Sequence, residues 1–423
     1  MGMFGFFRRN SKPSDTRTEW NDRGKKFAKE VNEMVSFAEK NGWDAWKGKD
    51  PKDERDHFAD EVVRLLKEAN ANGTVGDFRD AFPPAHTPLI RYFQQHGEHI
   101  GPLHSIGGNR LVFTIGAYYE PRRTCLLEGD VVTELAPTIE LVGKAKRGNV
   151  YATLGEGIIT TTQGWQGPVI AHFVLDITKM FPVEDMIPFN DGERVLLVTS
   201  EGIYVVSTDK EELLHPVPDP AEVDGGTNID MANATLSHEN QFIVVGDQCS
   251  EHRVLDGDGK EIGSIGQRSE YPHFCLFSSN DSQLITNSCH FYNGITIGVD
   301  ASVLKGLRLP PYEEVGPAIT IDDGMRIYVG LAVRDHYILG DAHGYVRAID
   351  THGKCLWRHF VGSTITGLAI SPDEQVLWVG SCTGMIHKLR LGKGHRDDQT
   401  IGNGEHFEEF RMIFWKGEPV MKW

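Results

Sequence analysis

The stretch Ile365–Leu391, ITGLAISPDEQVLWVGSCTGMIHKLRL, contains the pattern that decides the fold. Its apolar run LAI ends at the polar turn SPDE, VLWVG ends at SCTG, and MIHKLRL runs to Gly392. Short apolar runs bounded by Pro, Asp and Gly are typical of β-strands joined by tight turns. Three such strands cannot bury both faces of an isolated sheet, so we expect copies of this unit on either side of it.

Copies of the unit precede it along the chain. An apolar tetrad that follows a polar turn, as in GGNRLVFTI, occurs seven times, and the copies end at Ile115, Thr153, Val198, Val245, Thr286, Val329 and Val379. Successive copies are 38 to 50 residues apart. A period of roughly 40 to 50 residues with several strands is the signature of a β-propeller blade. We therefore predict a mainly β fold with a propeller of about seven blades at residues 100–392. The first two copies are the least regular, so six or eight blades are the alternatives.

Two stretches resemble known propeller repeats. Residues 365–391 resemble a WD-repeat blade, although they lack its closing Trp-Asp pair and its Gly-His dipeptide. Residues 338–362, ILGDAHGYVRAIDTHGKCLWRHFVG, resemble a quinoprotein-like repeat in their Asp-x-x-Gly turn and Leu-Trp outer strand. The resemblance extends over about residues 100–392. It implies a fold and not an activity, because propellers host many functions.

Residues 16–99 have helical patterns and predict a small α-helical domain before the propeller. Thr16 and Glu19 have the spacing of a capping box, and an apolar stripe follows as far as the stop at Asn41-Gly42. Asp50-Pro51 predicts a second helix start. Shorter helices are expected at residues 75–82 and 87–97. We expect these helices to pack on one another and on the propeller; a surface that recruits a partner is the alternative.

The two ends of the sequence are predicted separately. Residues 1–15 are expected to be a flexible N-terminus, because their apolar part is too short for a signal-peptide core. Residues 393–423 predict a polar linker followed by a closing strand or anchor. We interpret Phe410–Lys416 as a strand that packs on the propeller, with the outer strand of the last blade as one assignment. A clasp against the helical domain and a docking peptide are the alternatives.

The net charge of −17 lies almost wholly in the propeller. Residues 1–100 contain 17 basic and 17 acidic side chains, whereas residues 101–392 contain 21 basic and 37 acidic ones. This excess of acid disfavours binding to nucleic acid and favours a basic protein partner. No apolar run approaches the roughly 18 residues that predict a membrane span. The six cysteines form no CxxC pair, which indicates free thiols in the cytoplasm.

Catalytic and metal-binding motifs are not found in the sequence. No phosphate-binding loop, GxSxG elbow or HExxH pair occurs. Residues 256–259, DGDG, resemble part of a calcium loop but lack its downstream Glu, so we interpret them as a hairpin turn. His273, Cys275, Cys289 and His290 form the one cluster of soft ligands, which we interpret as part of a packed blade. We predict no cofactor, no metal and no catalytic residue.

Four acidic residues are the candidate partner-binding positions: Asp191, Asp322, Asp323 and Asp373. We place them at equivalent positions of their blades, where they cap turns or, if they share a rim, form an acidic face. The favoured function is a non-enzymatic interaction protein. A more specific version is an immunity or antitoxin protein that binds a basic effector such as a nuclease. A hydrolase or lyase with a site at the central channel and a scaffold subunit are the alternatives.

Overall fold

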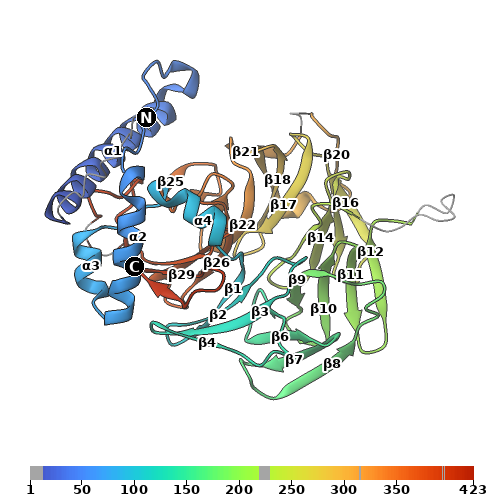
Figure 1. Cartoon of the computed structure of the whole chain (residues 1–423). Coiled ribbons are helices and arrows are strands. Elements are labelled where there is room, and N and C mark those ends of the chain that lie inside the picture. The colour runs from blue at the N-terminus through green and yellow to red at the C-terminus, as the bar shows by residue number, and fades with distance from the viewer. Residues whose placement is uncertain (1–12, 219–228, 314–315, 393, 395) are drawn as a thin grey trace, which may run out of the picture.

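The computed structural model describes residues 13–218, 229–313, 316–392, 394 and 396–423. Its strands form seven separate sheets, and these sheets are the blades of a β-propeller, with helices packed against one side (Figure 1). The predicted mainly β fold and the count of seven blades are confirmed.

Five blades contain four antiparallel strands each. The first has β1 Ile100–Gly107, β2 Arg110–Ile115, β3 Arg123–Glu128 and β4 Val131–Glu134; the second has β5 Leu141–Lys144, β6 Val150–Gly155, β7 Ile158–Gln163 and β8 Val169–Val174. The third has β9 Val183–Pro188, β10 Arg194–Thr199, β11 Gly202–Ser207 and β12 Glu211–His215. The fifth has β17 Tyr271–Phe277, β18 Gln283–His290, β19 Asn293–Asp300 and β21 Ala318–Asp323; the sixth has β22 Ile327–Val333, β23 His336–Asp341, β24 Tyr345–Asp350 and β25 Cys355–Phe360.

The other two blades contain a fifth strand. The fourth blade has β13 Asn233–Leu236, β14 Phe242–Gly246, β15 His252–Asp256, β16 Glu261–Ile265 and β20 Arg308–Leu309, and β20 pairs with β16 in parallel. The seventh has β26 Ile365–Ile370, β27 Val376–Ser381, β28 Met385–Arg390, β29 Phe407–Ile413 and β30 Met421–Lys422. The stretch that opened the sequence analysis therefore forms the three inner strands of the last blade.

Six of the seven repeated tetrads form the second strand of a blade, but the copy that ends at Val329 does not. That copy lies in β22, which is the first strand of the sixth blade, so its predicted equivalence with the others is wrong. The reason is local: Asp322 and Asp323 end β21 and Gly324 begins the connection to the sixth blade, and this polar stretch resembles the sequence of a turn inside a blade.

In the described structure, no blade combines strands from both ends of the chain. The first blade is built only from residues 100–134 and the seventh only from residues 365–422. Their apolar faces share one core that includes Ile100, Leu103 and Trp378. Just before β1, Glu98 N–H donates to the Phe414 carbonyl at 3.0 Å, and Lys416 N–H donates to the His96 carbonyl at 2.8 Å. Packing and this short bridge therefore join the two blades.

The helical domain consists of α1 Pro13–Asn41, α2 Ala59–Asn72, α3 Val75–Ala81 and α4 Ile90–His96, with short 3₁₀ turns between them. The helix predicted to start at Asp50-Pro51 begins only at Ala59, after a 3₁₀ turn at Asp56–Phe58. Before that turn, the carboxylate of Asp53 accepts from the backbone N–H and the guanidinium of Arg55. Thr16 lies inside α1, where its hydroxyl donates to Glu61 of α2 at 3.0 Å.

The tail joins the helices to the last blade. β29 pairs antiparallel with β28 and is the fourth strand of the blade, while the residues beyond it turn into the helical core. Trp415, Met421 and Trp423 are buried there against Trp20, Leu66 and other residues of α1, α2 and α4. The helical domain therefore lacks a complete core without the tail.

Residues 1–12 of the predicted flexible N-terminus lie outside the described residues, and Pro13 already belongs to α1. In the part of the chain that the structure describes, none of the helices combines the length and the apolar character needed to cross a membrane.

Candidate functional site

The two ends of the propeller differ in their side chains. We define the connection face as the end that carries the β2–β3, β6–β7, β10–β11, β14–β15, β18–β19, β23–β24 and β27–β28 turns, together with the segments that connect one blade to the next. The opposite end carries the turns between the first and second strands of each blade. Because every blade begins with its innermost strand, these two sets of turns lie on opposite sides of the ring.

Exposed aromatic side chains gather on the connection face. Tyr118 and Tyr119 lie on the β2–β3 turn, and Phe291 and Tyr292 lie on the β18–β19 turn. Tyr119 and Phe291 are 73% and 72% exposed, which is unusual for large apolar rings. Three more exposed rings lie at the same end. Tyr271 and Tyr328 lie at the start of β17 and β22, and Tyr312 follows β20. Among the described propeller residues, every exposed aromatic side chain lies at this end.

Carboxylates lie between the aromatic rings. Glu184, at the start of β9, has a pKa raised to about 7 by burial first and then by the charges of Asp185 and Asp230. The pKa of Tyr118 is raised by burial and by the same Glu184. On the other side of the ring, Glu270 lies 2.7 Å from His290, beside Phe291. The face therefore combines exposed rings with negative charge.

Arg326 fixes part of this face in place. Its Nη1 donates to the Phe291 carbonyl at 2.8 Å, and its guanidinium lies 4.9 Å from the centre of the Tyr328 ring. His273 packs edge-on against Tyr328 with ring centres 4.8 Å apart. These contacts fix the backbone of the β18–β19 turn at Phe291 and the position of the Tyr328 ring.

The four predicted acidic residues do not lie together. Asp191 and Asp373 lie in the β9–β10 and β26–β27 turns, at the end opposite to the connection face. Asp322 and Asp323 lie at the end of β21, where Asp323 pairs with Ile295 next to the β18–β19 turn, so they belong to the connection face. The predicted equivalence of the four positions is therefore wrong, because the sequence pattern does not distinguish the two ends of a blade.

Three of the four residues, Asp191, Asp322 and Asp373, accept hydrogen bonds typical of turns. Asp191 accepts the Glu193 N–H at 2.9 Å, and Asp373 accepts the Gln375 N–H at 3.2 Å. Asp322 accepts the Met325 N–H at 2.9 Å and lies 3.9 Å from Arg347. A role of these residues in partner binding stays a prediction.

The aromatic pairs were missed in the sequence. Tyr118-Tyr119 stands in GAYYEP and Phe291-Tyr292 in HFYNG, where Gly, Pro or Asn indicates a turn. Two adjacent rings in a turn have no strand face on which both can be buried. This pattern could have identified the face from the sequence.

The two clusters considered for metals lie in the fourth and fifth blades. In the DGDG segment, Asp256 accepts the N–H groups of Asp258 and Lys260, as a hairpin turn requires, so that interpretation is confirmed. His273 and Cys275 lie on β17, next to Cys289 of β18. Within the described ranges, no three His, Cys, Asp or Glu side chains converge as a metal site would need.

Polar groups at the inner strands bind neighbouring blades to one another. The Nε2 of His104 on β1 lies 2.8 Å from the Val142 carbonyl of β5, and the Lys144 ammonium of β5 donates to the Ser105 carbonyl of β1 at 2.8 Å. Burial lowers the pKa of His104 to about 4, so this imidazole is neutral near pH 7 and donates from Nε2. These two hydrogen bonds join the first blade to the second.

Comparison with known proteins adds little to this description. No protein-family model matches the chain, and no curated protein matches it. A solved structure described as "KlHsv2 with loop 6CD replaced by a Gly-Ser linker" is similar at 9% sequence identity and a TM-score of 0.46. The similarity covers 74% of this chain and 98% of that chain, and a likeness of this size carries no information on function.

Proposed function

We propose that this chain is a non-enzymatic binding protein that captures a basic protein with its connection face. The observation that carries the proposal is the gathering of all exposed aromatic rings of the described propeller at one end, among carboxylates. Tyr and other aromatic residues are enriched at the centres of protein interfaces, because a ring buries a large area at a small cost in conformational entropy.

The charge of the propeller supports a basic partner. Residues 101–392 contain 16 more acidic than basic side chains, so the field around the ring attracts positive surfaces and speeds their encounter. An immunity or antitoxin protein that blocks a basic effector in the cytoplasm fits this charge. The WD-repeat and quinoprotein likeness of the last two blades fits a rigid scaffold with a binding face and needs no catalytic group.

Affinity capture from the native host, with variants of the two ends, tests the proposal. The bait with Tyr119→Ser, Phe291→Ser and Tyr292→Ser should lose a basic protein that the unmodified chain captures. The matched control carries Val131→Ser and Val169→Ser, which remove exposed apolar side chains elsewhere on the propeller, and it should capture the partner normally. Capture should also weaken as salt rises from about 0.05 to 0.3 M, because screening shortens the reach of the acidic field.

Three results separate the parts of the proposal. Equal capture by the aromatic variant and the control contradicts the assignment of the face. An acidic partner contradicts the electrostatic argument. If a basic partner binds through this face but is harmless when expressed alone, the binding function stands and the immunity function fails.

A further inference from the structure

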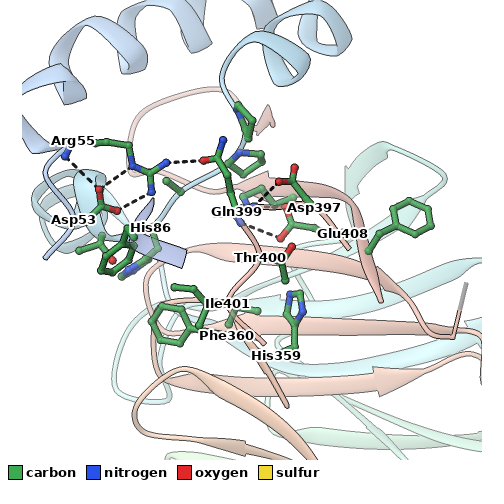
Figure 2. Close-up of a pocket in the computed structure, with 18 of the residues that line it drawn as sticks. Asp53, Arg55, His86, His359, Phe360, Asp397, Gln399, Thr400, Ile401 and Glu408 are labelled. Atoms are coloured by element: carbon green, nitrogen blue, oxygen red, sulfur yellow. Dashed lines mark hydrogen bonds and ion pairs between the residues drawn. The ribbon is translucent and has the colours of Figure 1, made fainter. Parts of the chain in front are cut away.

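A cavity of about 260 Å³ lies between the helical domain and the last two blades (Figure 2). Arg55 lies just before α2 and His86 just before α4, while β25 contributes His359 and β29 contributes Glu408 and Arg411. A cavity of this volume has room for a small molecule or for several waters. Its walls carry more polar than apolar groups, and this favours a polar occupant.

Glu408 is fully engaged by its neighbours. Its carboxylate accepts from Arg411 Nε at 2.8 Å and Nη2 at 3.0 Å, from His387 Nδ1 at 2.7 Å, and from Arg79 Nη2 at 3.3 Å. Burial acts to raise its pKa, but Arg411, His387 and Arg79 hold that pKa well below its usual range. Two guanidinium groups thus surround one carboxylate, and this part of the wall has an excess of positive charge.

Two donors at the wall have no partner in the described structure. Arg411 is 7% exposed, and its Nη1 makes no hydrogen bond. The Nε2 of His86 is also buried without a partner, while its ring stacks on Phe93 with centres 5.1 Å apart. A buried donor that lacks an acceptor is costly to a folded protein, so groups of this kind indicate an occupant that supplies acceptors.

The other carboxylates that line the cavity, Asp53 and Asp397, have local partners of their own. Asp53 is paired with Arg55 at 2.7 Å, and Asp397 accepts the Gln399 N–H at 2.7 Å. Burial first, and then charge–charge repulsion from Arg411 and His387, lowers the pKa of His86 to about 3. The imidazole is therefore neutral near pH 7 and can donate one N–H from Nε2 without adding a charge.

A strap of residues 396–401 covers the cavity. Asn32 of α1 donates to the Thr400 carbonyl at 2.9 Å, and Arg55 donates to Gln399 Oε1 at 2.9 Å. Outside the strap, a groove along α1 shares Asp397 and Thr400 with the cavity. Three cations, Lys25, Lys29 and Arg396, line that groove together with three carboxylates, Glu33, Asp397 and Asp398, so the groove has no net charge. Lys25 pairs with Asp398 at 3.3 Å and Lys29 with Glu33 at 3.8 Å.

We propose that the junction cavity binds a small oxyanion, a carboxylate or phosphate group, which accepts hydrogen bonds from Arg411 Nη1 and His86 Nε2. The planar guanidinium suits either group, because both present acceptor oxygens to parallel N–H donors. The ligand would contact the helices, the strap and the last blade together, so that its binding would stabilise the junction between them.

Isothermal titration calorimetry on the full chain tests the site, with inorganic phosphate, acetate and succinate as separate probes at constant ionic strength. We expect saturable binding of one molecule for at least one probe, and the probe that binds distinguishes phosphate from carboxylate. His86→Phe keeps the stacking on Phe93 but removes the donor, and should weaken binding about tenfold. His273→Phe, at a half-buried histidine of the fifth blade that also has an unpartnered ring nitrogen, should leave binding unchanged.

The ¹⁵N spectrum of the histidine-labelled, unmodified chain gives a second readout. It requires no substitution, so it is informative even if His86→Phe does not fold. Addition of the bound probe should shift the His86 Nε2 resonance and leave that of His273 in place. The proposal is overturned if none of the three probes gives saturable heat, if His86→Phe binds as tightly as the unmodified chain, or if the His86 resonance does not move.

Discussion

Replacement of Trp423 by Ala should detach the helical domain from the propeller. Trp423 is fully buried, and its ring lies 6.5 Å from that of Trp20 and 5.8 Å from that of Phe78. Its Nε1 donates to the Phe82 carbonyl at 2.8 Å. A buried Trp side chain covers roughly 200 Å². At about 25 cal/mol per Å², its burial is worth about 5 kcal/mol, and Trp→Ala substitutions in cores cost roughly 3–5 kcal/mol.

We therefore expect the variant to lose about 4 kcal/mol from the free energy that holds the helices on the propeller. The backbone bonds between Trp423 and Arg411 do not involve the side chain and should remain. Limited proteolysis of the segment between α1 and α2 measures this loss as an increase in the rate of cleavage. When opening is fast relative to cleavage, a loss of this size raises the cleavage rate about a thousandfold.

Trp43→Ala provides the control, because Trp43 lies in the same helical domain but is 60% exposed. This variant should change stability by less than about 0.5 kcal/mol. If Trp423→Ala loses less than about 1.5 kcal/mol, or is cleaved no faster than Trp43→Ala, the tail does not hold the helices and the reasoning is refuted.

The other predictions concern single groups. Arg358 is 1% exposed and pairs with Glu39 of α1, whose side chain is 40% exposed. In urea unfolding, Arg358→Met should therefore destabilise the chain by about 2 kcal/mol, and Glu39→Gln should cost less than half of that. Equal costs would contradict the argument. The carboxyl of Glu184 should titrate near pH 7 in a ¹³C spectrum, because burial and then Asp185 and Asp230 raise its pKa, and a midpoint near its ordinary value of 4.5 would show that it is hydrated. Burial lowers the folded-state pKa of four histidines to about 3, namely His86, His252, His273 and His359. Because their pKa in the unfolded chain is about 6.5, the free energy of unfolding should be highest above about pH 6.5 and should fall as the pH drops toward 3, by up to about 1.4 kcal/mol per pH unit for each histidine. A urea midpoint that is constant from pH 7 to 5 would contradict this.

The repeat of the blades could be predicted from the sequence because it depends on local signals. The second strand of each blade is buried on both sides, so an apolar tetrad follows each turn at a steady spacing, as at Val198 and Val245. The same locality explains the error at Val329, because the polar residues 322–324, where β21 ends and the connection between two blades begins, have the same composition as a turn within a blade.

The candidate sites depend on contacts that local patterns do not contain. His86, His359 and Arg411 come from three segments, and only the folding of the tail onto the helices brings them to one cavity. The acidic residues were grouped by their neighbours in sequence, whereas their side of the ring depends on strand direction, so Asp191 and Asp323 lie at opposite ends.

The shared core of the helices and the tail has a consequence for synthesis of the chain. Asn70 of α2 binds the backbone of Lys422, which is 352 positions later in the sequence. At about 5–20 residues per second, the ribosome needs roughly 20 to 70 s to reach the tail after α2 has emerged. During that interval the apolar faces of α1 and α2 lack the surface that covers them. The helical domain, although made first, can complete its core only after the last blade.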